Sequence, residues 1–248
     1  MPVSRFCPLV WLLCLAFPIA AQEPSDATYS RLNTFSGFSE YSNDSSHIIL
    51  GNAENRKIGA IGFQYQRRLV NRRLWNFSFT AEIRPGMLES DPTLIETVTY
   101  KLPPPPITVP YPETPVVVCR GATYTLTGQS PTGQQFSNVV TDTCARRTVI
   151  EQGFSPAGVR FNLMPRHRLQ LTFSSFAGYM FSTQDVPIPD AGSFNYTFEF
   201  GGGLEFFSSR TRSVRLEYQV QHFSNKQTAD QNPGVDSGLI KLTYAFGR

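Results

Sequence analysis

Histidine and cysteine are scarce in this 248-residue sequence, which contains three histidines and four cysteines. A structural zinc site takes roughly four nitrogen or sulfur ligands at close spacing. His47 and His167 have no further ligand at such a spacing, and only two cysteines remain after the N-terminal segment described below. The sequence therefore indicates no metal site, and no cofactor is expected.

Long apolar runs and concentrated charge are also missing. Hydrophobic residues make up 40% of the sequence and the mean hydropathy is −0.22, so no bundle of transmembrane helices is expected. The formal net charge is only +3 and the basic residues form no cluster, which argues against nucleic-acid binding. No Lys-Ser/Thr pair follows the glycine run Gly201–Gly203, so this run is not a phosphate-binding loop.

The N-terminus has the features of an export signal. Arg5 supplies a positive charge, residues 8–17 form a short apolar core, and Ile19–Ala21 offers a small residue before the cleavage point. The apolar core is too short to span a bilayer as a stable helix. We therefore expect residues 1–21 to be a signal peptide and residues 22–248 to form the mature, exported chain.

The mature chain keeps one pair of cysteines, Cys119 and Cys144. Export delivers a protein to an oxidising compartment, where a single cysteine pair forms a disulfide more often than a metal site. We therefore predict a disulfide between these two residues.

Aromatic residues are abundant, since 20 Phe and 10 Tyr contribute to an aromatic content of 13%. They recur at every second position, as in Arg73–Arg84, where Trp75, Phe77 and Phe79 alternate with polar residues. A period of two is typical of a β-strand with two different environments. The pattern predicts eight strands, at residues 34–41, 57–69, 73–84, 153–163, 168–181, 193–207, 213–223 and 236–246.

Residues 85–152 interrupt this pattern. Pro103–Pro106 and the prolines that follow favour polyproline II and are not compatible with a central strand. A small hairpin is expected at Ala122–Leu126, inside the loop that the disulfide would close. We interpret residues 85–152 as a long surface loop inserted between the third and fourth strands, and a small independent domain is the alternative.

Short and long connections alternate along the eight strands. An up-and-down barrel with short turns at one end produces this alternation, and bacterial outer-membrane barrels have it. The aromatic face of the strands suits lipid, and the opposite face suits a packed polar lumen. The polar face includes Glu82, Arg84, Arg160, Glu199, Glu205, Arg215, Glu217 and Lys241.

A soluble lipocalin-like barrel has the same alternation with the two faces inverted. Side-chain volume argues against it, because so many Phe, Tyr and Trp side chains would overfill an eight-stranded lumen. The C-terminal residues Tyr244–Phe246 are also similar to the aromatic last strand of outer-membrane proteins. We therefore predict an all-β fold, an eight-stranded antiparallel transmembrane barrel in the bacterial outer membrane.

Residues with catalytic chemistry gather in Gln221–Asn225 and in Asn232–Asp236. On the seventh strand, His222 and Ser224 share the lipid-side face, and Asp236 lies on the same face of the eighth strand. Antiparallel pairing brings these two strand ends together at the long-loop end. We therefore expect the three side chains to meet at the outer rim of the barrel, level with the outer leaflet.

Serine, histidine and a carboxylate are the parts of a serine hydrolase. Ser224 would attack an ester carbonyl, His222 would accept its proton, and Asp236 would orient the imidazole. Taken singly, H-x-S can be a rim histidine in an aromatic girdle, and N-P-G is first of all a turn signal. The spacing, the shared face and the position at the rim together favour catalysis. The candidates for the oxyanion hole are Asn225, Asn232 and the backbone N–H of Gly234.

The pattern H-x-S-N-x6-N-P-G-x-D, which runs from His222 to Asp236, resembles the active-site segment of the outer-membrane lipid A 3-O-deacylases, also called acyloxyacyl hydrolases. The resemblance implies catalytic roles for His222 and Ser224, and a part for Asn225 and Asn232 in oxyanion stabilisation. That family usually has Glu where this chain has Asp236, so the shorter carboxylate must come closer to the imidazole. The long disulfide-bearing insertion is a further departure.

Together these observations predict an outer-membrane serine esterase that hydrolyses an acyl ester of lipid A in lipopolysaccharide, at the 3-position by resemblance. The alternative is a non-enzymatic barrel whose surface loops bind ligands or partners. The sequence leaves open which acyl chain is removed, whether phospholipids also serve, and whether the barrel forms a homodimer.

Overall fold

The computed structural model describes residues 28–101 and 105–248. The expected signal peptide, residues 1–21, lies outside the described residues. Within the described ranges, all regular secondary structure is β. No helix in these ranges is long and apolar enough to cross a membrane.

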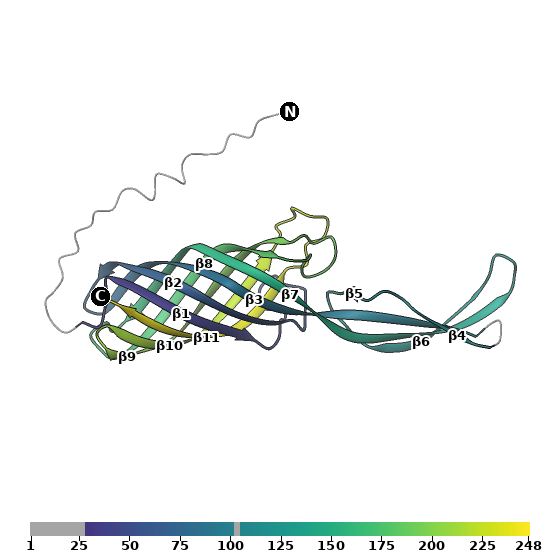
Figure 1. Ribbon diagram of the computed structural model, residues 1–248, viewed down its shortest axis with the longest axis horizontal. Helices are drawn as coiled ribbons and strands as arrows, with labels where there is room; N and C mark the ends of the chain where they lie inside the picture. Colours follow the sequence, from purple (N-terminus) through teal and green to yellow (C-terminus); the bar gives the residue numbers. More distant parts are fainter. Residues whose placement is uncertain (1–27, 102–104) are drawn as a thin grey trace, which may run out of the picture.

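Antiparallel pairing closes the sheet into a ring. Each neighbouring pair in the ring is antiparallel, β1 pairs with β11, and β3 pairs with β7, which returns the sheet to its start. The closed cylinder fills one half of the molecule in Figure 1. The prediction of an eight-stranded up-and-down barrel is thus confirmed. The ring strands are β1 (Asn33–Ser42), β2 (Lys57–Asn71), β3 (Trp75–Tyr100), β7 (Gln135–Leu163), β8 (Leu169–Ser182), β9 (Phe194–Ser209), β10 (Arg212–Ser224) and β11 (Val235–Gly247).

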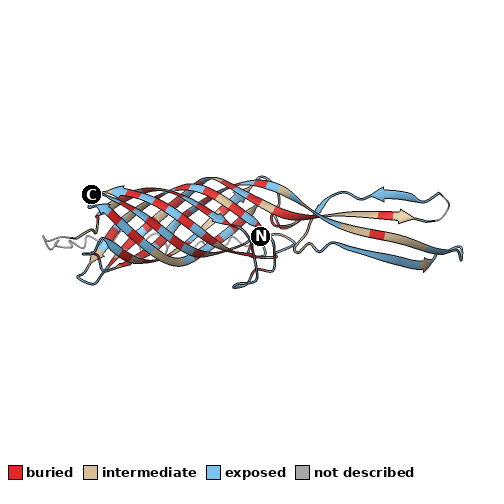
Figure 2. Ribbon diagram, turned by 90° about the horizontal axis from the view of Figure 1, so that it is seen from below, coloured by how far each residue is buried: buried red, intermediate tan, exposed pale blue. Residues whose placement is uncertain are grey.

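Burial alternates residue by residue along each barrel strand, as Figure 2 shows. On β10, for example, Leu216 and Tyr218 are exposed on the outside, whereas Glu217 and Gln219 are buried in the lumen. A charged lumen and an apolar exterior are the reverse of a lipocalin, so the soluble-barrel alternative fails. All eight predicted lumen residues are buried: Glu82, Arg84, Arg160, Glu199, Glu205, Arg215, Glu217 and Lys241.

A network of ion pairs fills the lumen. Arg84 contacts Glu40 at 2.6 Å, Glu82 at 3.0 Å and Glu199 at 2.5 Å. Further along the barrel, buried arginines pair with other carboxylates. Buried charges are tolerated only when they are paired and hydrogen-bonded, so these side chains must occupy the interior as a set. The other pairs are Lys241–Glu82, Arg160–Glu217, Arg215–Glu217 and Arg31–Glu205.

An apolar cluster closes the lumen at the long-loop end. It includes Phe223 from β10, Val235 and Leu239 from β11, and Val186 from the loop between β8 and β9. Phe223 lies between His222 and Ser224 in sequence and points inward, which fixes those two residues on the outer face. The remaining members are Ala53, Ile58, Ala60, Met87, Val149 and Met180.

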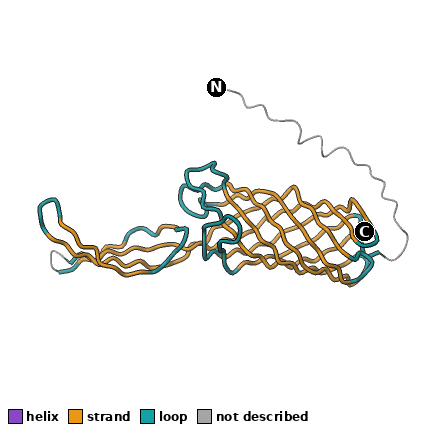
Figure 3. The backbone as a smooth tube through the Cα atoms, turned by 180° about the vertical axis from the view of Figure 1, so that it is seen from behind, coloured by secondary structure: helices purple, strands orange, loops and turns teal. Residues whose placement is uncertain are grey.

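The insertion differs from the expected loop. Strands β3 and β7 continue well beyond the barrel as one long ribbon, because their pairing extends to Thr99 and Val139. Shorter strands line this ribbon, so the insertion is a projecting antiparallel sheet (Figures 1 and 3). The predicted disulfide between Cys119 and Cys144 is present. The added strands are β4 (Ile107–Pro110), β5 (Thr114–Pro115) and β6 (Ala122–Gln129).

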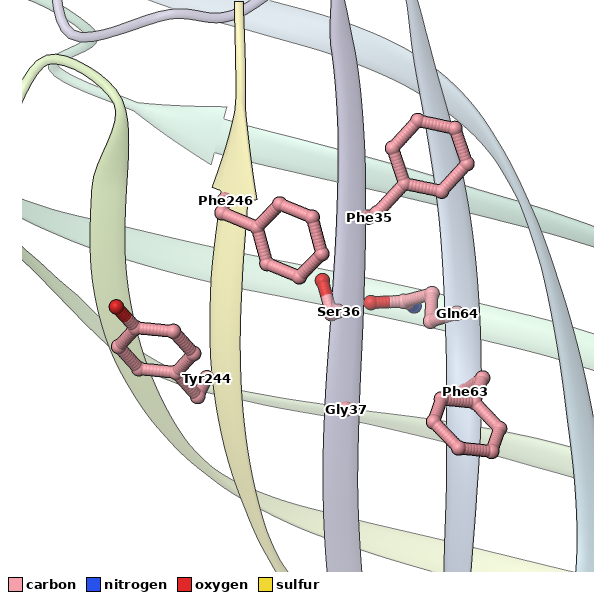
Figure 4. Close-up of a pocket in the computed structure, with 7 residues that line it drawn as sticks. All are labelled: Phe35, Ser36, Gly37, Phe63, Gln64, Tyr244 and Phe246. Carbon is pink, nitrogen blue, oxygen red and sulfur yellow. The ribbon is translucent and has the colours of Figure 1, made fainter.

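A shallow apolar groove crosses the outer face of β1 near the short-turn end. Phe35, Phe63, Tyr244 and Phe246 line it, and its floor is at Gly37 (Figure 4). The groove lies at the far end of β11 from Asp236, since Phe35 and Gly37 pair with Phe246 and Tyr244. It is therefore part of the lipid-facing surface and is separate from the catalytic candidates.

Substitution of Arg84 tests the lumen network. Arg84→Met leaves Glu40, Glu82 and Glu199 without their guanidinium partner, and an unpaired buried charge costs about 3–5 kcal/mol. We expect that loss in the free energy of unfolding, measured by urea titration of the refolded barrel. Arg210→Met, in an exposed turn, is the control. A loss below about 1 kcal/mol for Arg84→Met would show that the network is not required.

Candidate active site

The register between β10 and β11 brings His222 and Asp236 together. The two residues are direct cross-strand partners, as expected for the ends of antiparallel neighbours joined by residues 225–234. His222 Nδ1 donates a hydrogen bond to Asp236 Oδ1 at 2.6 Å. The shorter Asp carboxylate thus reaches the imidazole without any insertion or bulge, because the pair is directly opposite.

A cradle of backbone amides holds the other oxygen of Asp236. Its Oδ2 accepts N–H bonds from Ile48 at 3.0 Å, Leu50 at 2.9 Å and Gly51 at 2.9 Å, and also from Ile49. The Asp236 side chain is fully buried by this contact. Four donors on one oxygen favour the ionised carboxylate and fix its orientation.

The amide cradle lies in the loop between β1 and β2, residues 45–56. The ends of this loop meet where the Asn55 N–H donates to the Ser45 carbonyl at 3.1 Å, which makes it a compact Ω-loop. It also crosses to β11, because the Ser46 N–H donates to the Asp236 carbonyl at 3.0 Å. His47 Nδ1 donates to the Gly51 carbonyl at 2.6 Å and closes the cradle.

The role of this Ω-loop was not predicted from the sequence. His47 has no partner at metal-ligand spacing, and residues 48–51 carry no catalytic side chain. The one local signal was the apolar run Ile48–Leu50 followed by Gly51, inside a polar connection. Glycine is needed there because a Cβ at Gly51 would lie 2.5 Å from the Asp236 backbone nitrogen.

Gly234 leaves room for the imidazole. A Cβ at this position would lie 2.8 Å from His222 Cε1 and 3.5 Å from Nε2. The imidazole is thus enclosed on the Gly234 side, and its side chain is 16% exposed. Gly234 was expected to supply an oxyanion donor, and the geometry adds a steric role beside the catalytic base.

Ser224 ends β10 on the same outer face as His222. Residues two apart on a strand are separated by about 7 Å, so the side chains of His222 and Ser224 are neighbours on the outer face. In the described part of the chain the Ser224 hydroxyl makes no hydrogen bond. Catalytic hydrogen bonds are often long in ligand-free enzymes and shorten when substrate binds.

Asn225 was expected to help form the oxyanion hole, but its side chain is hydrogen-bonded within the loops. Its two Nδ2 hydrogens go to the Ala191 carbonyl at 2.6 Å and the Gln231 carbonyl at 2.5 Å, and its Oδ1 accepts the Gln227 N–H at 2.8 Å. The buried side chain therefore organises the loop after β10 and has no free donor for an oxyanion. Sequence alone could not show this, because the three partners lie in irregular backbone.

Asn232 lies at the exposed end of the same loop. Its Oδ1 accepts the Asn225 backbone N–H at 3.1 Å, which leaves its amide nitrogen available on the solvent side. Within the described residues, neither that nitrogen nor the Gly234 N–H donates a hydrogen bond. Asn232 and Gly234 thus fit the oxyanion expectation better than Asn225 does.

The arrangement can carry out nucleophilic acyl transfer. An imidazole held by a buried carboxylate lies two residues along the strand from a serine, on the same outer face. All three side chains belong to the outer, lipid-side face, at the long-loop end. Among the described residues, no group of three or more His, Cys, Asp or Glu side chains could hold a metal ion.

Replacement of the carboxylate by an amide tests the imidazole orientation. In Asp236→Asn, the amide oxygen would accept the four backbone N–H groups, and the amide nitrogen would donate to His222 Nδ1. The imidazole would then hold its proton on Nε2 and could not accept one from Ser224. We expect kcat for ester hydrolysis to fall by about 10⁴ with the fold unchanged by circular dichroism. A loss below about tenfold would contradict this role for Asp236.

Gly234→Ala tests the space beside the imidazole. The added methyl group would displace the His222 ring, and small displacements of catalytic groups cost up to about 10² in rate. Kinetics of the detergent-solubilised protein should show a fall in kcat of about tenfold to hundredfold. The matched control is Gly37→Ala on β1, whose Cβ would meet nothing within 4 Å. Equal rates in the two variants would refute the steric role.

Comparison with known proteins gives one family match. The model of the family described as Lipid A 3-O-deacylase (PagL) matches residues 120–245 of the 248. This segment is slightly more than half of the chain and contains His222, Ser224 and Asp236. No curated protein sequence matches the chain.

Solved structures give weak likenesses. Neisserial surface protein A (NspA) has a TM-score of 0.41 and 8% identity, over 87% of this chain and 97% of its own. An outer membrane channel from Pseudomonas putida F1 has a TM-score of 0.27 and 9% identity, over 91% and 99%. The NanC porin has a TM-score of 0.24 and 9% identity, over 88% and 100%. TM-scores this low support no argument about function.

The family match and the closed barrel lead to one conclusion. The matched segment covers β6 to β10 and most of β11, so it includes both strands that carry the His222–Asp236 pair. The chain belongs to the lipid A 3-O-deacylase (PagL) family, a family of bacterial outer-membrane hydrolases that act on lipid A.

Proposed function

We propose that this protein is an outer-membrane serine esterase that removes the 3-O-linked acyl chain from lipid A. The observation that carries the proposal is the 2.6 Å hydrogen bond between His222 and the buried Asp236, on the lipid side of the barrel and next to Ser224. An esterase for soluble substrates would have no reason to direct its catalytic residues at lipid.

The membrane orientation supports access to lipid A. Outer-membrane barrels keep their short turns in the periplasm, so the long-loop end, with the insertion at residues 85–152, lies outside the cell. The site at the rim is then level with the outer leaflet, where lipopolysaccharide resides. Lipid A can reach Ser224 by lateral diffusion, without entering the charged lumen.

The reaction proceeds through an acyl-enzyme. Ser224 Oγ forms a bond to the ester carbonyl carbon while His222 Nε2 takes the serine proton. The bond between the acyl carbon and the sugar oxygen then breaks, and that oxygen leaves on the sugar with the proton from His222. His222 then deprotonates a water molecule that attacks the acyl carbon, the bond to Ser224 Oγ breaks, and His222 returns the proton to Ser224 as the fatty acid leaves. Asp236 remains ionised throughout and stabilises the imidazolium.

We assign the stabilisation of the oxyanion to donors in the loop before β11. Asn232, through its amide nitrogen, and Gly234, through its backbone N–H, lie on the segment that leads into Asp236. Each donor in such a site is worth about 10²–10³ in rate. Asn225 contributes indirectly, because it ties this loop to Ala191 and thereby fixes the position of Asn232.

The proposal is tested by mass spectrometry of lipid A from cells that express the protein. We expect loss of one hydroxyacyl chain, and intact lipid A in cells that express Ser224→Ala, because the serine oxygen forms the acyl-enzyme. Heat-dependent gel mobility would confirm that both barrels are folded. Unchanged lipid A with folded wild-type protein would contradict the proposal. It would favour either phospholipid substrates or the alternative of a barrel whose loops only bind ligands.

A further inference from the structure

Arg56 lies at the long-loop end of the barrel, among its loops, and is fully buried. Its guanidinium donates to the carbonyls of Glu54 and Val117, each at 3.0 Å, and of Val116 at 2.9 Å and Pro187 at 3.2 Å. These carbonyls belong to three segments far apart in sequence, namely the Ω-loop, the insertion and the loop between β8 and β9. The Arg56 side chain therefore joins these three segments by hydrogen bonds.

The guanidinium is also paired with the long ribbon of the insertion. Its Nε lies 3.1 Å from Asp91 Oδ1 and 3.5 Å from Glu89 Oε1, and both carboxylates are buried on β3. Arg147 on β7 pairs with the other oxygen of Asp91 at 3.0 Å. Because the side chains of Arg56, Glu89 and Asp91 have no access to water, Arg56 is held in one place.

Arg56 is the last residue of the Ω-loop that carries the amide cradle. Its own N–H donates to Ser45 Oγ at 3.0 Å, and Ser45 Oγ donates to the Ala53 carbonyl at 2.9 Å. The two ends of the loop are thus fixed to Arg56. Between them lie the four N–H groups that hold Asp236 Oδ2.

The disulfide braces the segment that Arg56 binds. Cys119 is two residues after Val117 and is bonded to Cys144 on β7. Glu54 N–H donates to the Val117 carbonyl at 3.0 Å, so the same segment contacts the Ω-loop backbone directly. On its other side the segment follows the two-residue strand β5, and the Val116 N–H donates to the Pro92 carbonyl at 3.2 Å.

We infer that Arg56, braced by the Cys119–Cys144 disulfide, is a positioning residue that fixes Asp236 through the Ω-loop. The inference rests on the proposed function of the triad. It assigns to the insertion a role in positioning the catalytic residues. The base of the insertion orders the loop that orients the carboxylate, which in turn orients the imidazole. Loss of the brace should therefore reduce the rate of the chemical step and leave substrate binding unchanged.

A double-mutant cycle tests this route. Kinetics are measured on a chromogenic short-chain ester for the wild type, Arg56→Lys and Cys119→Ser/Cys144→Ser, each with Asp236 and with Asp236→Asn. Lysine keeps the positive charge beside Glu89 and Asp91 but cannot donate to four carbonyls at once. We expect kcat to fall about tenfold to hundredfold with KM unchanged, and to fall no further when Asp236 is already Asn.

Tyr111→Phe provides the matched control, because Tyr111 lies in the distal part of the insertion and is exposed. It should leave kcat unchanged. If a variant does not refold, dithiothreitol treatment of the folded wild-type protein breaks the same disulfide in place. Hydrogen exchange gives a readout without turnover: the amides of residues 48–51 should exchange at least about tenfold faster after reduction.

Either of two results would overturn the inference alone. One is an equal fall in kcat with Asp236 and with Asp236→Asn. The other is unchanged exchange at residues 48–51 after reduction. Both results count only if the wild-type protein hydrolyses the ester and the Ser224→Ala variant does not. Absence of hydrolysis by the folded wild type would instead overturn the proposed function and the inference together.

Discussion

Closure of the strand ring is the constraint on which the rest of this protein depends. In a bilayer, every backbone N–H and C=O must find a partner within the protein, and only a closed barrel allows strands to do so. Pairing of β1 with β11 and of β3 with β7 meets this requirement. Closure then gives each strand an inner and an outer face. The charges can be paired inside, and the chemistry can be directed outward to lipid.

The site uses two kinds of support for one carboxylate. The β-ladder places His222 opposite Asp236. The Ω-loop, which is far from Asp236 in sequence, surrounds the remaining carboxylate oxygen. This division suits a catalytic group at a membrane rim, where neither bulk water nor a deep protein core can hold a charge. Peptide N–H groups carry no net charge, so they stabilise the carboxylate without neutralising it. The carboxylate therefore stays free to stabilise the imidazolium.

The long-loop end is organised as a single unit. The Ω-loop contacts β11, the loop after β10 contacts the loop before β9 through Asn225, and Arg56 links the insertion to both sides. Beneath them, Phe223 and Leu239 help to seal the charged lumen with an apolar layer. Such interlocking lowers the mobility of loops that would otherwise be flexible at a sheet end. It also explains how an insertion remote from Ser224 in sequence can influence the site.

The sequence by itself determined the period-two faces, the eight barrel strands, the disulfide pair and the common outer face of His222, Ser224 and Asp236. These follow from local rules, because side chains alternate strictly along a strand and neighbouring antiparallel strand ends meet. Only the tertiary structure decided the amide cradle, the engagement of Asn225 by loop carbonyls, and the continuation of β3 and β7 into the insertion. The cradle joins residues 185 to 188 positions apart. It is made of main-chain N–H groups, which every residue except proline carries, so no side-chain pattern could reveal it.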